Sequence, residues 1–260
     1  MTSLLRYALD PITWARECLH FNPDPWQARV LESPKNILLN CSRQSGKSTT
    51  AAVLATHRAL FYPRSLVLMV SPSQRQSGEL FRKVMGNIEH LEIRKQLVED
   101  NALSLKMPNG SRIVSLPGSG ATVRGFSGVS LIIEDEAAQC ADELYYAIRP
   151  MLATGGGRLI LMSTPFGRRG HFYESYINGE VNAWERIEIP ATKCPRITPE
   201  FLEQEKNALG IWHFQQEYLC GFNDNNTSLF SADLIEGAFD DSVTLLFPRV
   251  NINKIIGETL

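Results

Sequence analysis

Residues 36–61 constrain the fold of this chain more than any other stretch. The apolar run NILLNC (36–41) is followed by the loop SRQSGKS and then by a helical pattern that continues to Phe61. A buried strand, a loop ending in Gly-Lys-Ser and a helix form a phosphate-binding unit, because the N-terminus of the helix attracts anions. The sequence therefore predicts an α/β fold built around a phosphate-binding loop.

The loop also identifies the residues expected to hold a nucleotide. Backbone N–H groups of residues 42–48 are expected to surround the phosphates. Lys47 would reach the β and γ phosphates, and the Ser48 hydroxyl would ligate Mg²⁺. Cys41 stands where such a loop usually has a glycine, and its small side chain is expected to serve there. The full set expected to bind nucleotide in and after the loop is Ser42, Gln44, Ser45, Gly46, Lys47, Ser48 and Thr49. A chance Gly-Lys-Ser on an ordinary loop is the alternative.

Composition limits the class of protein. The chain has 260 residues, 43% of them hydrophobic, which is enough for one large domain with a substantial core. It carries 26 Lys and Arg against 28 Asp and Glu. A protein that binds nucleic acid unaided is usually basic, so DNA contact here would need a local patch or a partner. Five cysteines lie far apart without a CxxC pair and predict free thiols in a reducing compartment. No apolar stretch approaches 18 residues, which favours a soluble intracellular protein with no membrane partner.

Short apolar runs alternate with helical patterns along the first two thirds of the chain. This alternation predicts a mainly parallel sheet flanked by helices. Expected strands are Asn36–Cys41, Leu66–Ser71, Val129–Glu134 and Arg158–Ser163, and expected helices are Lys47–Phe61, Gln74–His90 and Asp142–Met151. The segment LSLKMPNGSRIVSL differs, since two alternating stretches meet at Asn109-Gly110. It predicts a hairpin with a type I′ turn at the edge of the sheet.

The pattern after Pro190 becomes helical. Thr198 can cap the first helix, with Pro199 at its first helical position. From Asn223 onward the chain is polar, acidic and weakly periodic. We therefore expect one domain over residues 1–222, including a small helical lid subdomain at about 185–222, and a linker over residues 223–260.

A second motif, LIIEDEAAQC, places three acids at the end of a buried strand. Asp135 would hold Mg²⁺ through water, and Glu136 would polarise the attacking water as a general base. Glu134 is expected on the opposite face, because side chains alternate along a strand. The alternative is a solvated acidic turn.

A third buried strand, RLILM, ends in Ser163-Thr164-Pro165. The two hydroxyls suit a residue that senses the terminal phosphate, although a turn set by the proline would also explain them. Arg168, Arg169 and His171 follow as a basic cluster. This cluster suits either contact with a phosphate backbone or ordinary surface charge.

Four stretches, SRQSGKS, IIEDEA, MSTPFGRRGHFYE and FQQEYLCGF, together resemble the large terminase subunit of tailed double-stranded DNA bacteriophages and prophages. The resemblance covers roughly residues 20 to 230. It implies a P-loop NTPase of the ASCE, RecA-like type that hydrolyses ATP with Mg²⁺ and moves viral DNA into a prohead. The implied partners are double-stranded DNA, the portal protein and the small terminase subunit. The resemblance also implies a ring of copies on the prohead, a monomer when alone, and the cytoplasm of the bacterial host.

The resemblance adds roles for four residues. Gln27 would read adenine with Trp26 beside the base, unless the two only begin an amphipathic helix after Pro25. Arg43 would contact the γ-phosphate or a neighbouring carboxylate, unless it is a solvated loop charge. Arg124, in ATVRGFSG, would act as an arginine finger across a subunit interface, unless it is a surface charge. An arginine within the loop and a replaced first glycine are both features of this family.

The chain departs from the family in one respect. Large terminases continue with a nuclease domain, whereas here NKIIG is followed by no aspartate at the expected place. Asp240 and Asp241 lie in a polar stretch without strand patterns, so nuclease activity is not expected in this chain. We expect either a fragment or a naturally short subunit.

Three other functions compete with that of a DNA translocase. A helicase-like remodelling ATPase is the main alternative, since EDEA and STP are similar to helicase motifs, but it would need a second motor core. A scaffold that only binds ATP would not need Glu136. A small-molecule kinase would usually carry an arginine-rich lid and lack the Gln27 motif.

Overall fold

The computed structural model of the chain describes residues 2–118, 123, 125–179, 183–223 and 237–238. Arg124, Asp240 and Asp241 lie outside the described residues. The chain divides into a unit of residues Met1–Asn223 and a unit of residues Asp224–Leu260. The first unit holds every element discussed below. Among the described residues, no helix combines the length and the apolar character needed to cross a bilayer.

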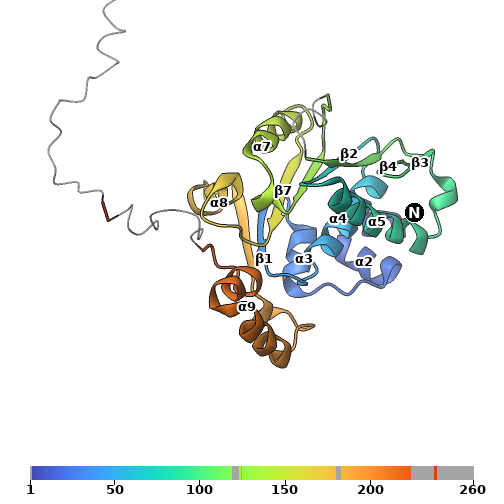
Figure 1. Cartoon of the computed structure of the whole chain (residues 1–260). Helices are drawn as coiled ribbons and strands as arrows, with labels where there is room; N and C mark the ends of the chain where they lie inside the picture. The colour runs from blue at the N-terminus through green and yellow to red at the C-terminus, as the bar shows by residue number, and fades with distance from the viewer. Residues whose placement is uncertain (1, 119–122, 124, 180–182, 224–236, 239–260) are drawn as a thin grey trace, which may run out of the picture. The chain divides into compact units, whose positions relative to one another are not determined.

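One sheet runs through this unit (Figure 1). Its strand order is β3-β4-β5-β2-β6-β7-β1-β8. The six strands from β5 to β8 in this order pair in parallel, and β3 and β4 form an antiparallel ribbon on β5. The strands are β1 Asn36–Cys41, β2 Leu66–Ser71, β3 Glu99–Asn101, β4 Ser104–Lys106, β5 Arg112–Pro117, β6 Leu131–Asp135, β7 Arg158–Ser163 and β8 Trp184–Ile189. The sheet confirms the predicted α/β P-loop NTPase architecture with a ribbon at one edge.

Helices cover both faces of the sheet. The α-helices are α1 Thr2–Leu9, α2 Pro11–Leu19, α3 Pro25–Glu32, α4 Lys47–Phe61, α5 Gln74–His90, α7 Asp142–Ile148, α8 Gly170–Asn178 and α9 Pro199–Leu219. Short 3₁₀ turns occupy Arg94–Gln96, Ala137–Gln139, Arg149–Leu152 and Ala191–Lys193. Helices α2 to α5 pack on one face in a core that includes Ile37 and Leu39, whereas α7 and α8 pack on the other with Leu38. Central strands buried on both faces read as continuous apolar runs, which is why they are visible in the sequence.

The predicted bounds hold for most central elements. Strands β1, β2 and β7 and helices α4 and α5 begin and end at the predicted residues. Strand β6 begins two residues later than predicted. The helix predicted over Asp142–Met151 ends at Ile148 and continues as a 3₁₀ turn that contains Pro150.

The hairpin forms at the predicted place, but its turn is not type I′. Lys106 pairs with Arg112, so the connection has the five residues 107–111. Only Gly110 of the pair Asn109-Gly110 has a positive φ, whereas a type I′ turn needs both. Asn109 instead donates from Nδ2 to the carbonyls of Ala59 and Leu60, at 2.8 and 3.0 Å. The hairpin is therefore fastened to the end of α4.

Strand β8 is an element that the sequence did not predict. The lid subdomain is expected from about residue 185, but Trp184–Ile189 pairs along its whole length with β1. This strand lies at the edge of the sheet and alternates polar residues with buried ones, so it lacks the apolar run of a central strand. The helical lid thus begins after the sheet ends, at the turn Ala191–Lys193.

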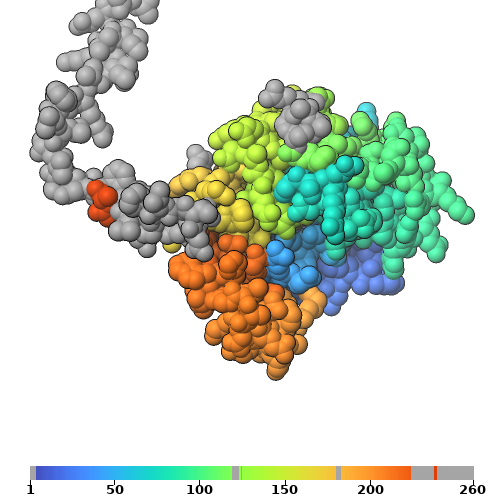
Figure 2. All heavy atoms as spheres, in the orientation of Figure 1, coloured from blue at the N-terminus to red at the C-terminus, as the bar shows by residue number. Residues whose placement is uncertain are grey.

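Helix α9 forms a small lobe with its own core. The Thr198 hydroxyl accepts a hydrogen bond from the Phe201 N–H at 3.3 Å, as the capping prediction requires. The helix is broken at Gly210, whose φ is +74°. Its core consists of Ala191, Leu202, Phe214 and Tyr218. Figure 2 shows the residues of α9, in orange, gathered into one lobe on the surface.

Candidate active site

A cavity of about 640 Å³ lies where α4 begins, at the carboxyl ends of the parallel strands. In folds of this kind, ligands bind outside the carboxyl ends of the strands. The cavity is lined by Arg43, Gln44, Gly46, Lys47, Ser48, Thr49, Gln76, Lys83, Glu136 and Gln139. The structure therefore brings most of the predicted loop residues together with Glu136.

The loop places its donors more narrowly than the sequence suggested. The N–H groups of Ser42 and Arg43 already donate to the carbonyls of Ile189 and Glu217, each at 2.9 Å. The N–H groups expected to surround phosphates are thus those of residues 44–48 rather than 42–48. Gly46 has φ +99°, and a Cβ added there would lie 2.9 Å from Gln27 Nε2. Glycine is required at this position both by its conformation and by this close approach.

Lys47 and Glu136 meet in the cavity. Lys47 Nζ lies 2.9 Å from Glu136 Oε1, although the two residues are 89 positions apart in the sequence. Burial opposes the charge of Lys47, but the carboxylates of Glu136 and Asp135 outweigh it and raise its pKa. Ser163 Oγ donates to Glu136 Oε2 at 3.4 Å. Strand β7 lies between β1 and β6, so its last residue lies between the loop and the acidic pair.

Asp135 is held beside this pair in a low-dielectric position. Burial and the neighbouring Glu136 charge raise the pKa of Asp135 to about 6. Its Oδ1 accepts the Glu136 N–H at 3.0 Å. Glu136 itself adopts φ +52°, a left-handed conformation that is uncommon for residues other than glycine. A cation near Asp135 would stabilise its ionised form.

The donor set at this site fits a nucleotide with a divalent cation. The Ser42 and Ser45 hydroxyls are buried without a hydrogen-bond partner, and unpartnered buried polar groups call for an explanation such as an absent ligand. The Ser48 hydroxyl and the Asp135 carboxylate are hard oxygen donors of the kind that Mg²⁺ takes. Thr164 is buried at the end of β7.

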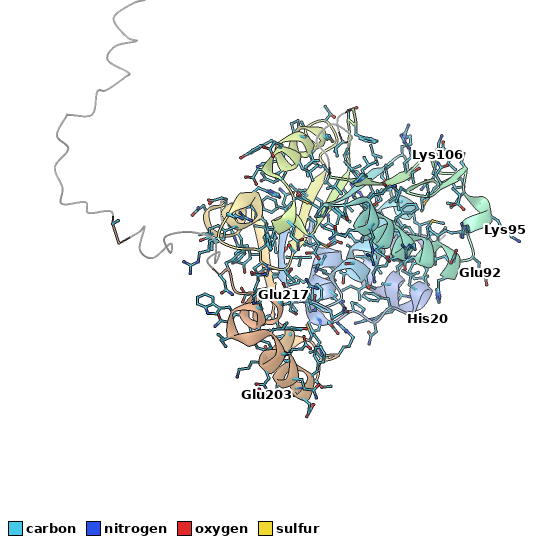
Figure 3. All side chains as sticks on the ribbon, viewed as in Figure 1. His20, Glu92, Lys95, Lys106, Glu203 and Glu217 are labelled. Carbon is cyan, nitrogen blue, oxygen red and sulfur yellow. The ribbon has the colours of Figure 1, made fainter. Side chains whose placement is uncertain are left out.

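Arg43 points toward α9 rather than along the loop. Its guanidinium forms an ion pair with Glu217, whose carbonyl also accepts the Arg43 N–H. Figure 3 shows Glu217 at the end of α9 nearest the sheet and Glu203 at the far end. Of the two contacts predicted for Arg43, the structure contains the one with a neighbouring carboxylate. This contact joins the phosphate-binding loop to the lid.

Trp26 and Gln27 do not line the cavity. Trp26 is 7% exposed and belongs to the core beneath the loop. Gln27 is buried, and its Oε1 accepts the Asp24 N–H at 2.8 Å as part of a capping box. Its Nε2 approaches Gly46. The role predicted for these two residues in reading adenine stays a prediction.

Glu134 faces away from Asp135 and Glu136, as the alternation along the strand predicts. It is completely buried, with Oε1 at 3.0 Å from His171 Nε2 in α8. The angles do not meet hydrogen-bond geometry, so charge holds this pair. His171 Nδ1 lies 3.1 Å from Asp142 Oδ1. The interpretation of His171 as part of a surface basic cluster with Arg168 and Arg169 is therefore wrong.

The pairing of His171 predicts a pH dependence of stability. Burial lowers the pKa of His171, but Glu134 and Asp142 outweigh burial and raise it overall. The stabilisation is therefore complete below about pH 6.5 and is lost as pH rises through the folded-state pKa. His171→Gln should lower the free energy of unfolding by roughly 3–5 kcal/mol at about pH 6 and by less at about pH 9. Urea unfolding across this range measures the difference.

His57 provides the matched control for this prediction. Burial lowers the pKa of His57, so its contribution should be lost as pH falls rather than as it rises. The two Gln variants should therefore differ from the wild type in opposite directions along the pH axis. A loss at His171→Gln that is the same at every pH would contradict the assignment of charge to this residue.

Four residues of the site had no signal in the sequence. Gln76 and Lys83 reach the cavity from α5, and Lys83 Nζ donates to Thr49 Oγ1 at 3.3 Å. Gln139 lines the cavity after Glu136. Arg196 donates to Asp24 Oδ2 at 2.7 Å and to the Ser45 carbonyl at 2.9 Å, which braces the loop. Their spacing matches no motif, because tertiary contacts alone bring them to the loop.

The fold and the site together define a P-loop NTPase of the α/β class. The sequence model of the family described as "Terminase large subunit, T4likevirus-type, N-terminal" matches residues 38–236. The chain belongs to this family of large terminase subunits.

Similar proteins agree with this assignment. The chain is 25% identical over 255 residues to the terminase large subunit of Thermus phage G20c, covering 83% of this chain and 52% of that protein. It thus spans about half the length of the curated relatives it matches. The large terminase ATPase domain of Thermus phage P74-26 superposes with a TM-score of 0.72 at 23% identity, covering 82% of this chain and 99% of that one. The large terminase of another thermophilic bacteriophage, solved in complex with ADP, has a TM-score of 0.59 at 14% identity and covers 84% and 53%.

Proposed function

We propose that this chain hydrolyses ATP with Mg²⁺ and that the hydrolysis drives translocation of double-stranded viral DNA into a prohead. The observation that carries the proposal is the contact between Lys47 Nζ and Glu136 Oε1 at the mouth of the loop, with Asp135 beside it. It places a phosphate-binding cation, a general base and a metal-binding carboxylate around one cavity. Complexes of a thermophilic bacteriophage's large terminase with ADP and with ATP-gamma-S support a nucleotide as the ligand.

Each residue would have a separate role. The N–H groups of residues 44–48 and Lys47 would hold the phosphates, and a phosphate oxygen would compete with Glu136 for Lys47 Nζ. Ser48 and Asp135 would hold Mg²⁺, which supplies positive charge against the phosphate oxygens. Glu136, once its carboxylate is free of Lys47, would take a proton from the attacking water. Ser163 contacts Glu136 and would keep its carboxylate oriented.

The coupling to DNA rests on family membership. We propose that the partners are double-stranded DNA, the portal protein and the small terminase subunit. We further propose that copies of the chain form a ring on the prohead in the host cytoplasm and are monomers when alone. The Arg43–Glu217 ion pair supplies a physical link for such coupling, since it connects the phosphate-binding loop to α9.

The test is a titration of the ATPase rate. The rate of the purified chain is measured with Mg²⁺ against increasing double-stranded DNA and, separately, against the portal protein. A translocase domain should be stimulated by its partners, and stimulation by the portal protein separates it from a helicase-like remodelling ATPase. A rate that responds to neither partner would contradict the translocase assignment while leaving ATP hydrolysis itself intact.

We also expect that this chain alone leaves DNA uncut. Two-metal cleavage of a phosphodiester needs several carboxylates around ions about 4 Å apart. Asp240 and Asp241 stand in a polar stretch without strand patterns on either side. Plasmid incubated with the chain and Mg²⁺ or Mn²⁺ should stay supercoiled. Nicking that disappears in a variant with both residues changed to Asn would contradict this expectation.

A further inference from the structure

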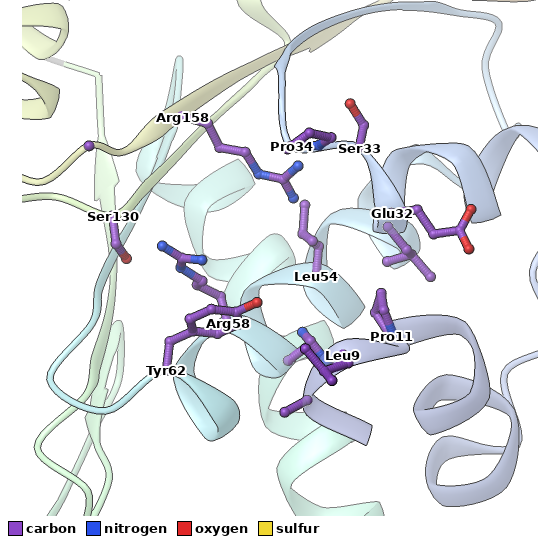
Figure 4. Close-up of a pocket in the computed structure, with 14 residues that line it drawn as sticks. Leu9, Pro11, Glu32, Ser33, Pro34, Leu54, Arg58, Tyr62, Ser130 and Arg158 are labelled. Carbon is purple, nitrogen blue, oxygen red and sulfur yellow. The ribbon is translucent and has the colours of Figure 1, made fainter. Parts of the chain in front are cut away.

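A second cavity lies at the opposite edge of the sheet from the phosphate-binding loop. Its volume is about 440 Å³, within the range of small-ligand sites. Ser130, just before β6, and Arg158, the first residue of β7, line it at the amino ends of the strands. Helices α1 to α4 supply the rest of the wall, including Leu9, Pro11 and Leu54 (Figure 4). The function proposed above makes no use of this cavity.

Two arginines face this cavity without an anionic partner. Arg58 comes from α4 and Arg158 from β7, and Figure 4 shows both guanidinium groups directed into the hollow. Among the described residues, neither guanidinium has an ion pair or a side-chain hydrogen bond. Arg58 Nε is buried without a hydrogen-bond partner. Its Cζ lies 4.0 Å from the centre of the Tyr62 ring, which orients the group but does not neutralise it.

The carboxylates near the cavity do not balance these charges. Glu185 is held by Arg29 and by the Ser33 hydroxyl. Glu32 lines the rim and is exposed. Burial and the neighbouring Arg58 charge lower the pKa of Arg158 to about 10, so both groups stay charged at neutral pH. Two like charges that share a partly buried cavity are unfavourable unless an anion joins them.

We propose that this cavity binds the phosphate group of a small phosphorylated compound, with Arg58 and Arg158 as its two cationic ligands. Guanidinium groups match phosphate through paired N–H donors, and two of them balance a doubly charged phosphate. The apolar side chains Leu9, Pro11 and Leu54 would contact the remainder of the compound. A phosphate of the DNA backbone has the same chemistry. A small compound is favoured because the arginines lie in an enclosed hollow rather than on an exposed ridge.

The experiment must first remove the phosphate-binding loop as a competing site. Inorganic phosphate is therefore titrated calorimetrically into the Lys47→Ala protein, in which the loop has lost its cation. Phosphate should still bind, and Arg58→Gln or Arg158→Gln in this background should weaken the affinity at least about tenfold. Arg82→Gln is the matched control, because Arg82 lies on the exposed face of α5, pairs with Glu79, and makes the same change in charge. Its phosphate affinity should equal that of the parent.

Thermal unfolding keeps the test independent of folding defects. With phosphate about tenfold above its Kd, the unfolding midpoint of the Lys47→Ala protein should rise by roughly 3–6 °C, and those of the two cavity variants should not. A short DNA duplex is added in a second arm. Displacement of phosphate by the duplex would support the phosphate site and assign the DNA backbone as its source, whereas no displacement would assign a small compound. Absence of phosphate binding in Lys47→Ala, or binding unchanged by both cavity substitutions, would overturn the proposal.

Discussion

Replacing Glu136 by Gln is expected to lower ATP turnover by roughly 10²–10⁴-fold while ATP stays bound. The amide cannot accept the proton of the attacking water. The phosphate-binding loop, Ser48 and Asp135 are untouched by the change, so the groups proposed to hold nucleotide and Mg²⁺ remain. The substitution also releases Lys47, whose Nζ lies 2.9 Å from the Glu136 carboxylate. Affinity for ATP should therefore be equal to that of the wild type or higher.

Lys47→Ala is the contrasting variant. It removes the charge expected on the β and γ phosphates, so affinity and turnover should both fall. Calorimetric titration with ATP and a steady-state assay of phosphate release, applied to both variants, separate binding from chemistry. Normal turnover in Glu136→Gln would show that another residue activates the water and that the acidic pair has been assigned wrongly.

Arg124→Ala is expected to have an effect of similar size, by a different route. We propose that Arg124 completes the active site of a neighbouring copy, and an arginine finger contributes roughly 10³–10⁵ in rate. The monomer should then hydrolyse ATP slowly, and the rate should rise more steeply than linearly with protein concentration. Arg124→Ala should abolish this rise and leave ATP affinity nearly unchanged.

Mixing two inactive variants tests whether Arg124 acts across an interface. Arg124→Ala subunits keep Glu136 and can receive an arginine from Glu136→Gln subunits, so the mixture should recover part of the rate. Arg43 is the competing candidate, since it lies on the loop of the same chain. Its guanidinium is held by Glu217, which favours a role in joining loop and lid. A mixture without rescue, together with a rate linear in concentration, would return Arg124 to the status of a surface residue.

The parts of the fold that the sequence predicted are those set by local pattern. Strands β1, β2 and β7 are buried on both faces, so each appears as an unbroken apolar run. Helix α4 follows a loop whose Gly46 needs a left-handed conformation, and this marks where the helix begins. Asp135, Glu136 and Ser163 could be placed together because parallel strands end at one edge of a sheet.

The parts that the sequence did not predict depend on contacts between distant residues. Strand β8 is recognisable only by its pairing with β1, because its own residues alternate like those of many surface segments. His171 follows two exposed arginines, yet it is buried against Glu134 from another element. Arg196 braces the loop through the Ser45 carbonyl, 151 positions away in the sequence. No local pattern could distinguish these residues from surface charges.

The central claim is that ATP binds over the loop between Gly46 and Glu136. A crystal structure of the chain with Mg²⁺ and a non-hydrolysable ATP analogue tests it most directly. We expect the triphosphate against the N–H groups of residues 44–48 and the metal ion beside Ser48 and Asp135. Lys47 Nζ should move from Glu136 to a phosphate oxygen. A nucleotide bound elsewhere, or one bound here with the Lys47–Glu136 contact still at 2.9 Å, would contradict the claim.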